Sequence, residues 1–193
     1  MWAGSLSHNG LTGLGGMKDF AVHQLGHELS AMFDTAHGAS LATVWGAWAK
    51  AVYRTKPSRF ARFARNVWGV TEADEEKAAL EGMKKTVAFF RSIGMPTSME
   101  ENKDIGLQDD VTLHDLAYRC TYHRTRSIGA FRVLGEEEIY QIYKAADHTE
   151  KRNRVWKPPT ATSRPFVMNA SLFRSSHPGS HHDPAGPSRS QFL

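Results

Sequence analysis

The sequence predicts an all-α fold, a bundle of helices without a sheet. Apolar residues recur at helical spacing through the first three quarters of the chain. No segment alternates polar and apolar residues over the length of a strand. Turn-forming residues separate the helical segments at Lys56-Pro57-Ser58, at Gly94-Met95-Pro96 and at Gly135. We therefore expect helices joined by short loops.

Four apolar stripes each predict one helix, because their members fall on one helical face. In chain order the stripes are Val22, Leu25, Leu29 and Met32-Phe33; Leu80, Met83, Val87 and Phe90; Leu113, Leu116, Ala117 and Cys120; and Ile139, Ile142, Tyr143 and Ala146. Acidic residues at 72–76 and 136–138 predict first helical turns, where the helix dipole favours negative charge. Cys120 lies on an apolar face, so we expect it in the core.

The two ends of the chain differ from the middle. Residues 2–6 read as the interior of a helix with no cap residue before them, which predicts that a preceding segment is missing. After about Thr149 the chain becomes rich in Pro, Ser, Arg and His and loses its apolar period. We predict a helical domain at 1–149 and a disordered basic tail at 150–193. The tail histidines, among them His177, His181 and His182, are expected to be solvated.

Charge and cysteine content narrow the function classes. The tail holds seven Lys or Arg against Glu150 and Asp183, a net +5. Because the whole chain carries +4, the preceding 149 residues carry −1, so nucleic-acid binding by the folded part is disfavoured. No apolar run is long enough for a membrane span, and the first residues do not form a secretory signal. A single cysteine fits a reducing compartment, and we predict a cytoplasmic protein.

Three histidines between residues 23 and 37 are the strongest chemical signal. His23 and His27 are four residues apart on a predicted helix, so both point from one face. Asp34-Thr35 predicts a helix stop followed by a new N-cap, which puts His37 in the first turn of the next helix. Such a corner can aim three imidazoles at one point, and imidazole is a preferred ligand of first-row divalent metals.

Two other metal motifs fit less well. A zincin needs Glu directly after its first histidine, whereas Gln24 stands there. His114-Asp115 is similar to the His-Asp pair of helical metal-dependent phosphohydrolases, but the other spaced ligands of that class are missing. We expect His114 and Asp115 to be a capping or surface pair.

The segment 16–42 resembles the signature of the iron-containing alcohol dehydrogenases, especially the NADPH-preferring butanol dehydrogenase branch. Its histidines stand four and then ten residues apart, with the third followed by glycine, here His23, His27 and His37-Gly38. The likeness runs from about residue 2 to 147. Its further matching segments are 2–4, 9–13, 27–31, 61–64, 89–97, 128–129 and 140–144.

The resemblance implies a helical bundle equivalent to the C-terminal domain of that family, which is dehydroquinate synthase-like. It places His23 and His37 at two metal-ligand positions and His27 at a catalytic position facing substrate and nicotinamide. The remaining ligands, an Asp and a His, would lie upstream. So would the N-terminal α/β cofactor domain, which is missing from these residues.

The function implied is that of a metal-dependent, NAD(P)H-linked alcohol dehydrogenase or aldehyde reductase. Its cofactors would be Fe²⁺, or Zn²⁺ in some members, with NADP(H) or NAD(H) bound by the missing domain. Its substrate would be a small primary alcohol or aldehyde, and the full-length enzyme would be a homodimer. With two of four ligands, the chain alone is expected to bind metal poorly and to be inactive. The alternative is a non-catalytic helical module whose basic tail binds acidic partners.

Overall fold

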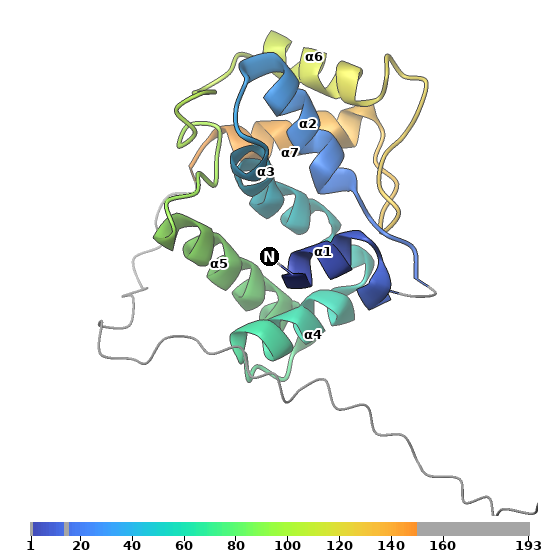
Figure 1. Ribbon diagram of the computed structural model, residues 1–193, viewed down its shortest axis with the longest axis vertical. Helices are drawn as coiled ribbons and strands as arrows, with labels where there is room; N and C mark the ends of the chain where they lie inside the picture. Colours follow the sequence, from blue (N-terminus) through green and yellow to red (C-terminus); the bar gives the residue numbers. More distant parts are fainter. Residues whose placement is uncertain (1, 14–15, 150–193) are drawn as a thin grey trace, which may run out of the picture. The chain divides into compact units, whose positions relative to one another are not determined.

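The fold is built from helices, as the sequence predicts. A computed structural model describes residues 2–13 and 16–149 (Figure 1). The elements are α1 Trp2–His8, η1 Leu11–Gly13, α2 Ala21–Phe33, α3 His37–Val52, η2 Tyr53–Thr55, α4 Pro57–Trp68, α5 Glu75–Ser92, α6 Asp110–Cys120 and α7 Glu136–Asp147. The described residues contain no strand, and their β-structure is one isolated bridge between Ile128 and Leu134. The predicted tail at 150–193 lies outside the described residues.

Helix α3 is central to the packing. It contacts α2, α5 and α7 (Figure 1). Helices α2 and α7 each also contact α6. Leu25 and Leu29 of α2 and Val44 of α3 are fully buried in the main core. Burying a side chain of this size stabilises a fold by about 1.5–3 kcal/mol. Tyr143 of α7 is also fully buried, and its hydroxyl donates to the carbonyl of Leu25 at 2.9 Å. This bond ties α7 to the helix that carries His23 and His27.

The helix ends follow the predicted turn chemistry. Pro57 occupies the first position of α4, where its missing N–H leaves no bond unmade. Gly135 precedes α7, and its N–H donates to the Glu138 carboxylate at 3.0 Å. The acidic segment 72–76, predicted as a first helical turn, begins before α5. Asp74 is the N-cap of this helix, and its side chain accepts from the Lys77 N–H at 2.8 Å. The first turn of that helix therefore begins at Glu75.

Helices α4 and α5 pack at very short distance. A Cβ atom placed on Gly82 of α5 would lie 2.9 Å from the Ala64 Cα of α4, closer than real side chains approach. Ala61 and Ala64 are fully buried in this contact. Small residues on both helices therefore permit the close crossing.

Cys120 is a free thiol with no exposed surface, so its predicted core position is confirmed. Within the described residues, none of the helices has the length and apolar content of a bilayer span.

Candidate metal centre

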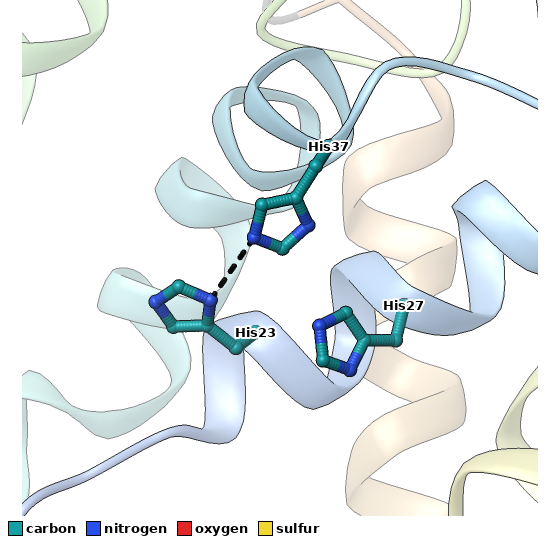
Figure 2. A group of neighbouring side chains, drawn as sticks. All are labelled: His23, His27 and His37. Carbon is teal, nitrogen blue, oxygen red and sulfur yellow. Dashed lines mark hydrogen bonds between the residues drawn. The ribbon is translucent and has the colours of Figure 1, made fainter. Parts of the chain in front are cut away.

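The structure brings the three predicted histidines together. His23 and His27 lie on successive turns of α2, and His37 is the first residue of α3 (Figure 2). The Nδ1 of His23 is 3.2 Å from the Nε2 of His37. One ring nitrogen from each of the three residues lies within 4.8 Å of the other two. Groups of three or more His, Cys, Asp or Glu side chains can hold a metal ion when they lie this close together. Among the described residues, these three histidines are the one such group.

A sharp corner between α2 and α3 directs His37 back toward α2. Asp34 ends α2 in the left-handed conformation with φ 52°, and its N–H donates to the Ser30 carbonyl. The N-cap of α3 is Ala36, so the expected N-cap at Thr35 is wrong by one residue. Thr35 is instead buried, and its hydroxyl accepts from the Asn102 side-chain amide at 3.2 Å.

Gly26, between His23 and His27, allows the start of α3 to lie against α2. A Cβ atom at this position would meet the Ser40 Oγ at 2.9 Å and the Leu41 Cδ2 at 2.8 Å. Ser40 is fully buried, and its hydroxyl donates to the backbone carbonyl of His37 at 2.8 Å. Because glycine has no side chain, α3 can lie close enough to α2 to bring His37 beside the rings of His23 and His27.

Asp19 fixes the start of α2. Its Oδ1 accepts from the Ala21 N–H at 2.7 Å, and its Oδ2 accepts from the N–H groups of Ala130 and Phe131 at 3.0 and 2.6 Å. One carboxylate thus joins the first turn of α2 to the loop before α7. Neither Gly26 nor Asp19 was identified from the sequence. Two of the three N–H partners of Asp19 lie more than 100 residues away, and the neighbours of Gly26 belong to the next helix.

The site favours neutral imidazole at His23. Partial burial lowers the pKa of His23, and the neighbouring His37, His27 and His8 lower it further. A lowered pKa keeps the ring unprotonated near neutral pH, and only an unprotonated nitrogen can bind a metal. His8 of α1 lies edge-on to His23, with ring centroids 6.2 Å apart. His8 is a neighbour of the site that the sequence did not reveal.

The donor set fits a divalent transition metal. Two nitrogens that each lie about 2.1 Å from one tetrahedral ion are roughly 3.4 Å apart. The separation of 3.2 Å between His23 and His37 matches this requirement. His27 and His37 are exposed and His23 is partly buried, so an ion could reach the rings from solvent.

His114 and Asp115, the pair similar to phosphohydrolase ligands, have other partners. The His114 ring stacks on Tyr140 with centroids 3.8 Å apart. Asp115 forms an exposed ion pair with Arg119 one turn along α6. These contacts agree with a surface role for both residues.

Comparison with known proteins places the chain in a family. Residues 4–147 match the family described as "Fe-containing alcohol dehydrogenase family, C-terminal". The chain is 32% identical over 146 residues to NADH-dependent butanol dehydrogenase A of Clostridium acetobutylicum, covering 75% of this chain and 36% of that protein. It is also 32% identical over 146 residues to the NADPH-dependent aldehyde reductase YqhD of Escherichia coli, covering 76% and 37%.

Solved structures agree with the sequence comparison. The NADH-dependent butanol dehydrogenase A of Thermotoga maritima superposes with a TM-score of 0.68 at 29% identity, covering 76% of this chain and 38% of that one. A substrate- and cofactor-free form of the Escherichia coli aldehyde reductase also superposes with a TM-score of 0.68, at 30% identity. The chain thus spans little more than a third of the length of these relatives. By sequence and by fold, it belongs to the iron-containing alcohol dehydrogenase family and corresponds to its C-terminal, helical part.

Proposed function

We propose that this chain is the metal-binding helical part of an NAD(P)H-linked alcohol dehydrogenase or aldehyde reductase. The observation that carries the proposal is the 3.2 Å separation of the His23 and His37 nitrogens at the corner between α2 and α3. Family membership supports the same reaction class, because the relatives are named as butanol dehydrogenases and aldehyde reductases.

In this proposal, His23 and His37 hold Fe²⁺ or Zn²⁺ through neutral imidazole nitrogens. The metal would supply Lewis acidity toward the oxygen of a small primary alcohol or aldehyde. His27, one turn from His23 on the same face of α2, would orient the substrate or relay a proton between the substrate oxygen and solvent. Its exposure leaves its ring free to exchange that proton with water.

The nicotinamide cofactor, NADP(H) or NAD(H), is assigned to a part of the enzyme outside residues 1–193, as the family resemblance implies. We therefore expect the purified chain alone not to oxidise NADPH when butanal and Fe²⁺ are supplied, because no hydride donor is held beside the site. Turnover that disappears in a His37→Ala variant would contradict this expectation.

A chimera tests the proposed function itself. Residues 2–149 would replace the matching C-terminal part of the Escherichia coli aldehyde reductase. The chimera should reduce butanal with NADPH in a metal-dependent way, and His37→Ala should lower kcat/KM by at least about 100-fold, equivalent to about 3 kcal/mol of transition-state stabilisation. Circular dichroism and NADPH binding would first establish that each chimera is folded. Activity that survives His37→Ala in a folded chimera would sink the proposal.

We also propose a cellular location and an oligomeric state. The single, buried cysteine is compatible with a reducing, cytoplasmic location. The family resemblance suggests a homodimer for the complete enzyme, which sedimentation of the chimera would measure.

A further inference from the structure

A surface pocket lies between three segments that are far apart in the sequence. Its volume is about 390 Å³, a size that suits a small organic ligand. Its walls come from the segment before α2, from the start of α4 and from the loop before α7, and they include Met17, Asp19, Lys56, Arg59 and Phe131. The three histidines of the candidate metal centre do not line this pocket.

Hydrogen bonds hold the walls of the pocket in place. Asp19 joins the first wall to the third, because its Oδ2 accepts from the N–H groups of Ala130 and Phe131 at 3.0 and 2.6 Å. Arg132, the next residue of the same loop, donates from Nη1 to the Ala51 carbonyl at 2.7 Å, which ties the loop to the last turn of α3. The walls are therefore fixed before a ligand binds, and this lowers the entropic cost of binding.

Two cations of the pocket have no partner in the described part of the chain. Lys56 directly precedes α4, and Arg59 lies in its first turn. Among the described residues, neither side chain forms an ion pair, a hydrogen bond or a ring contact, whereas the nearby Arg54 pairs with Glu76. The carboxylate that lines the pocket, Asp19, already accepts three backbone N–H groups. The pocket therefore offers two unpaired positive charges to a ligand.

Apolar surface lies beside these charges. Met17 is 88% exposed, although a long apolar side chain is usually covered. Phe131 is partly exposed, and its ring packs edge-on against the buried Phe60 with centroids 5.8 Å apart. A ligand in this pocket would thus meet charge on one side and apolar surface on the other.

We propose that this pocket binds a small phosphorylated compound, with the phosphate on Lys56 and Arg59 and the apolar part against Met17 and Phe131. A phosphate monoester carries about two negative charges near neutral pH, which the two cations match. An arginine guanidinium can also donate two parallel hydrogen bonds to phosphate oxygens. The proposal goes beyond the proposed function and does not rest on it, because no histidine of the metal centre lines the pocket.

Arg62 provides a matched control. It lies three residues after Arg59 on α4 and is exposed, as Arg59 is, but it does not line the pocket. Replacing either arginine by Gln removes one positive charge from the same helix. Unspecific attraction of anions to α4 would predict equal effects of the two substitutions, whereas a binding pocket predicts an effect for Arg59 only.

The test is saturation-transfer difference NMR of phenyl phosphate with the untagged 193-residue chain. EDTA is present in every sample, so that no metal ion contributes to binding. We expect saturable binding that inorganic phosphate displaces, and at least about fivefold weaker binding of phenol, which lacks the phosphate. Lys56→Gln and Arg59→Gln should each raise the Kd of phenyl phosphate by about fivefold or more, and Arg62→Gln by less than twofold.

Three results would overturn the proposal. The first is a Lys56→Gln/Arg59→Gln double variant that binds phenyl phosphate as tightly as the parent. The second is an equal loss of binding in Arg62→Gln and Arg59→Gln, and the third is equal binding of phenol and phenyl phosphate. Far-UV circular dichroism shows whether each variant is folded, and Lys56→Gln, at an exposed position before the helix, decides if Arg59→Gln is not. Because the samples are free of metal, none of these results bears on the metal centre.

Discussion

At the residue scale, the surroundings of Cys120 determine its reactivity, and those of Asp19 determine its contribution to stability. Burial raises the pKa of the Cys120 thiol to about 12, and the nearby Glu28 carboxylate adds to the shift. The thiol is therefore protonated and inaccessible in the native protein at pH 8. We predict no reaction with a disulfide reagent such as DTNB in the folded state, and one thiol per chain after guanidinium unfolding. Rapid stoichiometric reaction of the native protein would contradict the buried position.

The same thiol makes stability depend on pH. Below its ordinary pKa of 9.0 the thiol is protonated in both folded and unfolded chains, so its contribution to stability is complete. As pH rises from 9.0 toward 12, only the unfolded chain ionises, and stability falls. Between pH 7 and 9.5, urea unfolding should show about 1 kcal/mol of loss that a Cys120→Ala variant lacks. An identical pH dependence in both proteins would refute this assignment.

Asp19 should contribute more to stability than a surface carboxylate. Asp19→Asn leaves one carbonyl oxygen to serve three backbone N–H groups, so some of the bonds to Ala21, Ala130 and Phe131 must be lost. We expect a loss of about 1–3 kcal/mol in the free energy of unfolding. Asp115→Asn is the control, since the exposed pair with Arg119 should contribute at most about 0.5 kcal/mol. Equal effects of the two substitutions would argue against an anchoring role for Asp19.

The three histidines of the candidate site were accessible from the sequence, whereas the residues that position them were not. The spacing of His23 and His27 predicts that they share one helix face because helical geometry is local, and the predicted helix stop at Asp34-Thr35 allows His37 to lie beside them. Asp19 accepts hydrogen bonds from residues more than 100 positions away. Gly26 matters only because Ser40 and Leu41 lie against it. No local pattern encodes the long-range contacts of Asp19, and the contacts of Gly26 depend on how α3 packs against α2.

At the scale of elements, the close crossing of α4 and α5 gives a sharp prediction. A Gly82→Ala substitution adds a Cβ that collides with the Ala64 backbone. The helices must separate, which should cost about 1–3 kcal/mol even though alanine favours a helix by about 1 kcal/mol over glycine. Thermal or urea unfolding measures the difference.

Gly38 supplies the matched comparison, because no atom lies within 4 Å of a Cβ built there. Gly38→Ala should leave stability unchanged or raise it by up to about 1 kcal/mol. If Gly82→Ala were equally harmless, the short distance between α4 and α5 would be incorrect.

Four of the described helices were predicted from an apolar stripe, whereas α3 and α4 were not singled out. Helices α6 and α7 bury every residue of their predicted stripes, and α2 buries Leu25 and Leu29. In α5 only Met83 of the predicted stripe is buried, and the other buried residues are Ala78, Ala79, Gly82 and Thr86, because this helix also packs closely on α4. Helix α3 is in contact with three other helices and is apolar on several sides, which weakens the stripe. Helix α4 carries apolar residues at helical spacing, Phe60, Phe63, Ala64 and Val67, so its pattern is present in the sequence although it was not among the four predicted stripes.

At the scale of the whole molecule, the described helices form a scaffold that holds one corner in place. Helices α2 and α3 carry the histidines, and α7 and the loop before it lock α2 through Tyr143 and Asp19. The chain spans little more than a third of the length of its relatives. Catalysis is therefore proposed for a complete enzyme, and metal binding is the property to measure on this chain alone.

The most direct measurement is Zn K-edge X-ray absorption of the zinc-loaded chain with the three tail histidines replaced by Ala. A metal held by His23 and His37 predicts nitrogen neighbours at about 2.0–2.1 Å, together with outer-shell scattering from imidazole rings. This scattering should be strongly reduced in the His23→Ala/His37→Ala double variant. A spectrum of oxygen neighbours alone, or one that the double variant leaves unchanged, would contradict the central claim that this corner binds the metal.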